Sequence, residues 1–91
     1  MKSLRSTEHQ KLIALLTSAR TKAGMTQQQL ADALGKPQSF VAKYEGGERR
    51  IDVVELVVIA KVLNLDPARA VKEVAATYGE VKRPTTPAKH R

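Results

Sequence analysis

The sequence has 91 residues, a length that accommodates one domain. It contains no cysteine, which excludes disulfide bonds and thiolate metal sites. Sixteen lysine and arginine residues against nine acidic residues give a net charge of +7, which favours a polyanionic partner only where the charge gathers on one face.

Apolar residues recur at intervals of three and four along most of the chain, a period that predicts helices rather than strands. The first helix is expected over about residues 8–23, with Gly24 as its terminator. Residues 1–7 carry Lys2 and Arg5 and no acid, so we expect them to form a flexible basic arm. The apolar stripe of the first helix comprises Leu12, Leu16, Ala19 and Ala23.

Two short helices follow, and local signals mark their ends. Thr26 and Gln29 have the spacing of a capping box, so the second helix begins at Thr26 and ends at Gly35. Pro37 opens the third helix, because proline is tolerated in the first turn and not in the interior. This helix is expected to reach about residue 45 and to stop at Gly46-Gly47.

The remaining helices are marked in the same way. Asp52 and Glu55 form a second capping box, which predicts a fourth helix to about Leu63. Asp66-Pro67 combines an N-cap with a first-turn proline and predicts a fifth helix to about Tyr78.

These signals predict an all-α fold, a compact five-helix domain over residues 8–79. Residues 80–91 contain two prolines, two threonines and several bases, a composition typical of a disordered basic tail. The charge within the domain is uneven. Residues 20–50 carry six bases and three acids, whereas residues 51–80 carry three bases and five acids. One basic half is expected of a domain that meets a polyanion with one face, although a solvated surface can carry the same charges.

The second and third helices have the dimensions of a helix-turn-helix, with small Ala31 where the two helices must approach closely. Judged by spacing alone, these two helices fit a simple corner in a helical bundle equally well. The residue types favour the helix-turn-helix, because Gln38, Ser39 and Lys43 lie near one outer face. Glutamine can pair with adenine, serine with several groups, and lysine with guanine or phosphate.

The stretch from Met25 to Leu65 resembles the helix-turn-helix family of phage repressors, Cro proteins and xenobiotic-response-element-type regulators. The resemblance covers about residues 12–65. It rests on Arg20, Thr26-Gln27, Leu30-Ala31, Gly35, Gln38-Ser39, Val41, Tyr44-Glu45 with Gly47, and Ile59-Ala60.

This resemblance implies a lambda-repressor-like domain that binds an operator as a dimer. It implies base reading by Gln38, Ser39 and Lys43 and a phosphate contact by Gln27. Two positions depart from the family. Gly46 stands where asparagine or arginine often helps to hold a phosphate, and Ala42 stands on the outer face where longer side chains are common.

Several other charged residues lie close to this motif. Arg49 and Arg50 are interpreted as phosphate contacts, and Lys36 beside the turn is a further candidate, although each fits an ordinary surface charge as well. The family pattern pairs Arg20 with Glu45, which predicts a structural ion pair rather than a DNA contact.

Chemistry beyond binding is not expected. His9 and His90 are predicted to lie outside the packed core and far apart, so neither a metal site nor a nucleophile with a base is indicated. We therefore expect no enzyme activity and no cofactor. No signal-peptide pattern and no apolar run near the roughly 20 residues of a membrane span occur, which predicts a soluble, cytoplasmic protein that associates with the nucleoid.

The fourth helix is apolar on two sides, which indicates burial on both. One stripe comprises Leu56, Ile59, Ala60 and Leu63. The opposite stripe either meets the fifth helix of the same chain or forms a two-fold interface, and we favour the interface. It would comprise Val54, Val58, Val62, Val74 and Tyr78.

The predicted function is sequence-specific regulation of transcription by a homodimer on a palindromic operator of double-stranded DNA. One alternative is an antitoxin that also represses its own operon, with the toxin as protein partner. Another is an adaptor that kept the fold and binds protein only. An anti-repressor is a further candidate partner.

Overall fold

The computed structural model describes residues 6–79 and residue 84. Within this part of the chain there are five helices and no strand, so the predicted all-α fold is confirmed. The helices are α1 (Thr7–Lys22), α2 (Gln27–Leu34), α3 (Gln38–Glu45), α4 (Val53–Val62) and α5 (Pro67–Tyr78). None of these helices is long and apolar enough to span a membrane. Most of the expected N-terminal arm and of the expected tail lies outside the described residues.

The two predicted capping boxes are present. The Thr26 hydroxyl accepts a hydrogen bond of 3.0 Å from the Gln29 backbone N–H, and Gln29 Oε1 accepts one of 2.9 Å from the Thr26 N–H. Asp52 and Glu55 make the same exchange at the start of α4, at 2.7 and 3.0 Å. Each box satisfies two of the backbone donors that a helix start leaves unpaired, which explains why these boundaries were readable from the sequence.

The first helix differs from its prediction. It begins at Thr7, with the Ser6 hydroxyl as cap, so two residues of the expected flexible arm belong to the helix start. Its buried side chains are His9, Ile13 and Leu16, whereas Ala23, predicted on the apolar stripe, is exposed. Ala23 lies at the C-cap, beyond the last turn that packs against the rest of the domain.

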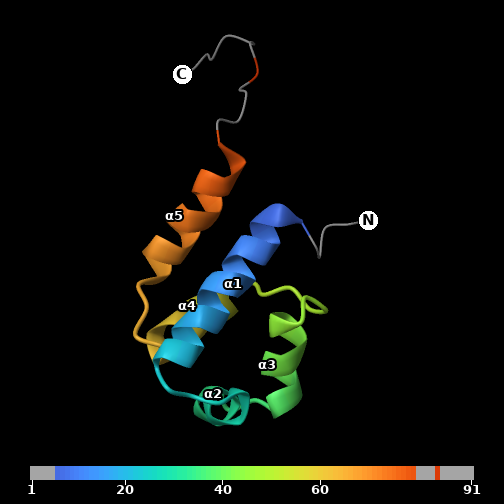
Figure 1. Ribbon diagram of the computed structural model, residues 1–91, viewed down its shortest axis with the longest axis vertical. Helices are drawn as coiled ribbons and strands as arrows, with labels where there is room; N and C mark the ends of the chain where they lie inside the picture. Colours follow the sequence, from blue (N-terminus) through green and yellow to red (C-terminus); the bar gives the residue numbers. More distant parts are fainter. Residues whose placement is uncertain (1–5, 80–83, 85–91) are drawn as a thin grey trace.

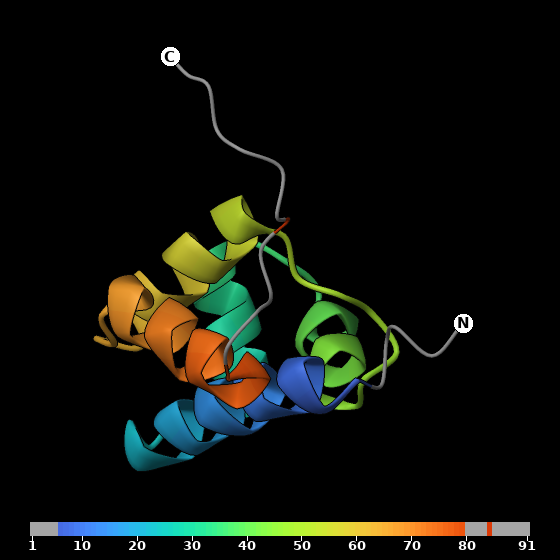
Figure 2. The same cartoon turned by 90° about the horizontal axis from the view of Figure 1, so that it is seen from above.

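The helices pack around one small core. Figures 1 and 2 show α5 lying along α1 with α4 on its other side, while α2 and α3 close the lower end of Figure 1. Tyr44, Leu16, Leu30, Ile59 and Val41 are the largest side chains that are fully buried. Burial of an aliphatic side chain of this size contributes about 1.5–3 kcal/mol, so the side chains from α1, α2, α3 and α4 that meet here fix how the helices cross.

The turn between α2 and α3 sets the position of α3. Gly35 has φ +68°, a left-handed conformation that glycine adopts without steric cost. The next N–H, of Lys36, donates to the Ala31 carbonyl at 2.9 Å and closes the end of α2. Ala31 is fully buried, so α3 can approach α2 closely, as the sequence predicted.

Candidate nucleic-acid interface

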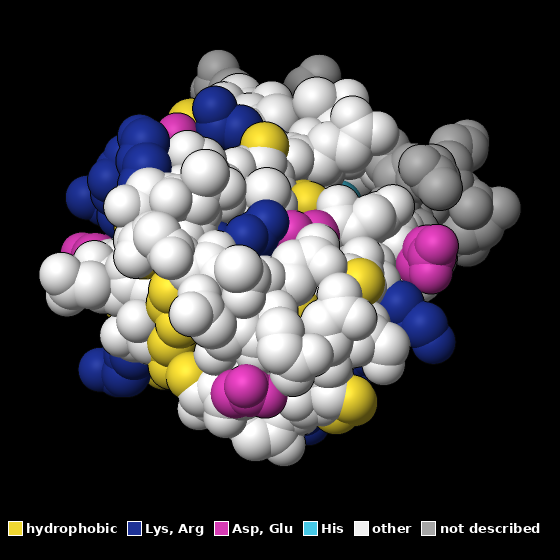
Figure 3. Space-filling model, turned by 60° about the horizontal axis from the view of Figure 1, so that its bottom comes forward, with side chains coloured by type: hydrophobic (Ala, Val, Ile, Leu, Met, Phe, Trp, Pro, Cys, Tyr) yellow, Lys and Arg dark blue, Asp and Glu magenta, His cyan; other side chains and the backbone are white. Residues whose placement is uncertain are grey.

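The outer face of α3 is polar and exposed. Gln38, Ser39 and Lys43 are all exposed, whereas Val41 and Tyr44 on the inner face are fully buried. The helix is therefore anchored by one face and presents the other to solvent. Figure 3 shows the lower end of the molecule from this side. Neutral polar side chains and backbone cover much of it, with lysine and arginine groups mostly toward its edges.

The predicted partners Arg20 and Glu45 form a two-pronged ion pair. Arg20 Nε lies 2.7 Å from Glu45 Oε2, and Arg20 Nη2 lies 3.0 Å from Glu45 Oε1. The remaining guanidinium nitrogen, Nη1, donates to the Met25 carbonyl at 2.8 Å. Arg20 and Glu45 side chains are 16% and 7% exposed. The hydrogen bonds to Glu45 raise the pKa of Arg20, so its guanidinium stays charged.

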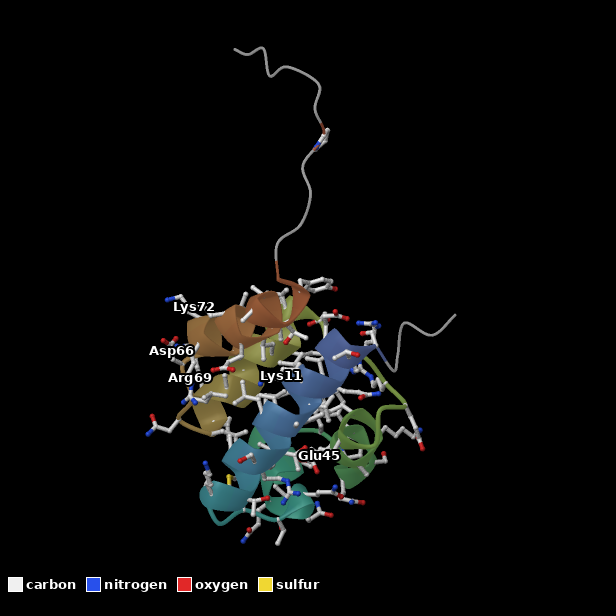
Figure 4. All side chains as sticks on the ribbon, turned by 45° about the horizontal axis from the view of Figure 1, so that its top comes forward. Lys11, Glu45, Asp66, Arg69 and Lys72 are labelled. Atoms are coloured by element: carbon white, nitrogen blue, oxygen red, sulfur yellow. The ribbon has the colours of Figure 1, made fainter. Side chains whose placement is uncertain are left out.

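From this ion pair, hydrogen bonds continue to the start of α3 through two glutamines. Gln27 Nε2 donates to Glu45 Oε1 at 2.9 Å, and Gln38 Nε2 donates to Gln27 Oε1 at 2.8 Å. The hydrogen bonds thus run from α1 through Glu45 and α2 to the first residue of α3. Figure 4 shows Glu45 between α1 and the α2–α3 pair. This link was not predicted, because its donors and acceptors are far apart along the chain.

Arg49 makes contacts that the sequence did not predict. Its Nη1 and Nη2 lie 3.0 and 2.8 Å from the two carboxylate oxygens of Glu55. Its guanidinium carbon lies 4.8 Å from the centre of the Phe40 ring, within the range of a cation–π contact. The hydrogen bond from Arg49, together with that from the Asp52 backbone, lowers the pKa of Glu55 to about 2. Arg49 therefore connects the loop after α3 to α4. A DNA phosphate would have to compete with Glu55 for the Arg49 guanidinium.

The other predicted backbone contacts lie on the surface near α3. Lys36 is exposed beside the turn, with Nζ 5.4 Å from the centre of the Phe40 ring, and Arg50 is exposed in the loop before α4. Gly46 is the C-cap of α3. A Cβ atom there would lie 3.1 Å from the Ala42 carbonyl oxygen, a tight contact with backbone.

The prediction that the histidines lie outside the packed core is wrong for His9, which is only 5% exposed. It lies one turn before Ile13 on the buried face of α1, within the range predicted for this helix, so the error was to treat the first turn as a flank of the core. Its Nε2 has no hydrogen-bond partner among the described residues. Burial, and then the positive charge of Arg50, lower the pKa of His9. His90 lies outside the described residues, and within them no group of three His, Cys, Asp or Glu side chains could hold a metal ion.

The residues predicted for a dimer interface divide into two groups. Val54, Val58 and Tyr78 are 73%, 45% and 60% exposed, whereas Val62 and Val74 are partly buried. Val62 packs against the core of its own chain. Sequence reasoning missed two further exposed side chains, Val53 and Val71. The large hydrophobic side chains that are exposed in the described part of the chain all lie on α4 or α5. We call Val53, Val54, Val58, Val71 and Tyr78 the α4–α5 apolar face.

Comparisons with known proteins place this geometry in a family. A family model described as helix-turn-helix matches residues 16–69. An XRE-family like protein from Pseudomonas syringae pv. tomato str. DC3000 is 41% identical, with 84% of this chain and 93% of that chain covered and a TM-score of 0.75. The clp gene regulator ClgR from Corynebacterium glutamicum shares the fold at 24% identity, with 79% and 77% covered and a TM-score of 0.69. A search of curated proteins found no match.

The resemblance predicted from the sequence is therefore confirmed by both kinds of comparison. The family model covers well over half of the chain, and the Pseudomonas protein is similar over nearly all of its own length. The assignment supports binding of double-stranded DNA. The chain belongs to the XRE-type helix-turn-helix family of DNA-binding transcription regulators.

Proposed function

We infer that this protein acts in the cytoplasm as a homodimer that binds a palindromic operator, with α3 of each protomer in the major groove. The observation that carries this inference is the exposed row of Gln38, Ser39 and Lys43 on a helix whose other face is buried. Because this helix is already anchored, its side chains can reach base edges with little further loss of conformational freedom on binding.

Gln38 is suited to read adenine. An amide has two N–H donors and one carbonyl acceptor. One N–H of Gln38 is used by Gln27, so the second N–H and the carbonyl remain for N7 and the N6 amino group of adenine. Because Gln27 is itself held by Glu45, the Gln38 amide is oriented before DNA arrives. Ser39 and Lys43 would read or contact neighbouring positions.

Contacts to the DNA backbone would come from around α3. Gln27 at the first turn of α2 has one N–H beyond its bond to Glu45, and the start of a helix attracts phosphate. Lys36 and Arg50 are exposed on the flanks of α3. Arg49 would contribute less than these residues, because Glu55 already holds its guanidinium.

The α4–α5 apolar face would form the two-fold interface. Its side chains are 45–73% exposed in the single chain, and clustered exposed apolar side chains mark interaction sites. We favour a second copy of this chain as the partner that covers this face, because two protomers on one palindrome double the contacts to DNA. A toxin or an anti-repressor that covers the same face is the alternative, and the oligomeric state separates the two.

Selection of duplexes from a random pool tests the whole proposal. We expect enrichment of a sequence with two inverted half-sites whose centres lie roughly 34 Å apart. Footprinting should then protect both half-sites together, and sedimentation should give a dimer at micromolar concentration. Equal affinity for all duplexes would contradict base reading by α3. A single half-site bound by a monomer would contradict the dimer and leave the face to a protein partner.

A further inference from the structure

A shallow groove lies between the second half of α1 and the connection from α4 to α5. Its volume is about 370 Å³. Its lining, which we call the apolar floor, is mostly apolar and also includes two cations, Lys22 and Arg69, and two neutral polar residues, Ser18 and Asn64. The apolar residues that line it are Leu15, Ala19, Ala23, Leu63 and Leu65. None of the residues proposed above to contact DNA or a second protomer lines this groove.

Among the described residues, neither cation at the groove has a counter-ion. Lys22 and Arg69 are exposed and form no ion pair with any of the described residues, whereas Lys11, Arg20 and Arg49 each pair with a glutamate. Asp66, close to Arg69 in sequence, instead accepts a hydrogen bond of 3.0 Å from the Ala68 N–H and caps α5. Figure 4 shows Arg69 near the start of α5, with α1 between it and α3.

We propose that this groove binds a short acidic segment of a partner protein, anchored by aliphatic side chains. The apolar floor accepts leucine-like side chains, and Lys22 from α1 and Arg69 from α5 attract carboxylates from two elements. Charge complementarity together with an apolar floor selects this occupant. A DNA backbone requires the cations and gains nothing from the apolar floor.

A small molecule fits this groove less well than a peptide does. Small-molecule sites usually bury most of the ligand surface, whereas this groove is a shallow hollow on the surface between two elements. A peptide can place one or two side chains in such a hollow and leave its backbone in solvent. The proposal adds a protein contact to the DNA-binding function, on a surface that stays accessible while α3 faces DNA.

The test uses the full chain and a labelled peptide that alternates glutamate with leucine. We expect fluorescence anisotropy to detect binding, and amide NMR signals to shift at Leu15, Lys22, Leu65 and Arg69. Lys22→Glu combined with Arg69→Glu should weaken binding about tenfold or more, because two attractive pairs become repulsive. The matched control is Lys61→Glu with Lys72→Glu, which changes the net charge equally at two exposed lysines outside the groove. This control should retain most of the affinity.

Three results would overturn the proposal. One is equal binding of a peptide with serine in place of leucine, because the apolar floor would then have no role. Another is a set of NMR shifts centred on Gln38 and Lys43, which would show that the peptide only imitates DNA. The third is a loss of DNA affinity in the groove variant that exceeds the loss in the control, which would assign Lys22 and Arg69 to the DNA backbone.

Discussion

The α3 surface, formed by Gln38, Ser39 and Lys43, and the α4–α5 apolar face are both exposed, but their side chains are held very differently. On the α3 surface, Gln38 is tied through Gln27 and Glu45 to Arg20 on another helix. On the α4–α5 apolar face, Val53 and Val54 are 72% and 73% exposed, and a valine side chain has no polar group that a hydrogen bond could orient. Polar groups that must meet defined partners need orientation, whereas apolar side chains gain free energy from any surface that removes them from water. This difference indicates that the α3 surface is suited to specific recognition and the α4–α5 apolar face to association.

The largest effect is expected at the ion pair that orients the α3 surface. Arg20→Ala and Glu45→Ala should each lower the free energy of unfolding by about 3–5 kcal/mol, because each leaves a mostly buried charge without its partner. The double variant should recover part of this loss. Chemical denaturation measures all three variants.

The control for that experiment is the exposed pair of Lys11 and Glu73, whose side chains are 48% and 38% exposed. Its removal should cost less than about 1 kcal/mol. Equal costs for the two pairs would show that burial does not make the Arg20 pair special, and the proposed orientation of α3 would lose its main support.

The next effect concerns the α4–α5 apolar face. Val58→Glu should weaken dimerisation by at least about 2 kcal/mol, because each protomer loses apolar burial and must remove a carboxylate from water. The single chain should stay folded, since Val58 is 45% exposed in it. Lys61→Glu, at another exposed position of α4, is the control. Sedimentation with circular dichroism separates dissociation from unfolding, and a wild-type monomer at high micromolar concentration would rule out the interface.

A smaller effect separates base reading from backbone contact. Gln38→Ala should weaken binding to the selected operator by about 1–3 kcal/mol and relax preference at one base pair. Arg50→Ala should instead weaken binding to all duplexes alike and lower the salt slope by about one unit. Binding assays at several salt concentrations on matched and mismatched duplexes measure both. If the two variants show the same sequence profile, the division into reading and backbone residues is wrong.

Arg49 tests whether a residue beside the α3 surface serves folding or DNA. Arg49→Ala should lower the melting temperature less than Arg20→Ala does, because Arg49 is 42% exposed. The lowered pKa of Glu55 means that its contribution to stability is full above about pH 4.5, its ordinary value, and is lost as the pH falls towards about 2. Over the same acidic range, the stability of Arg49→Ala should fall less than that of the wild-type protein. If Arg49→Ala leaves the stability unchanged and weakens DNA binding, Arg49 contacts phosphate and has no structural role.

The sequence predicted what depends on neighbours along the chain and on the family pattern. The capping boxes at Thr26 and Asp52 span three residues each, so the starts of α2 and α4 were predicted correctly. The bond between Glu55 and Arg49 depends on the path of the loop between them, and no local pattern encodes that path. The bridging role of Gln27 likewise requires three elements to be placed in space. The burial of His9 was missed because the first turn of the predicted helix was treated as a flank, although residue 9 lies one turn before Ile13 on the packed face.

His9 supplies the smallest effect and a pH dependence within the folded core. Burial and Arg50 lower its pKa below the ordinary value of 6.5, so near that pH the unfolded chain binds more protons than the folded chain. Stability should therefore be full above about pH 6.5 and should fall as the pH drops from there towards the lowered pKa. His9→Gln should flatten this part of the curve, and His90→Ala, which removes the other histidine, should leave the slope in place. Thermal unfolding across this range measures the slope. A slope that persists in His9→Gln would assign the titration to another group. A slope of opposite sign would mean that the folded protein stabilises the charged imidazole, which burial beside Arg50 should prevent.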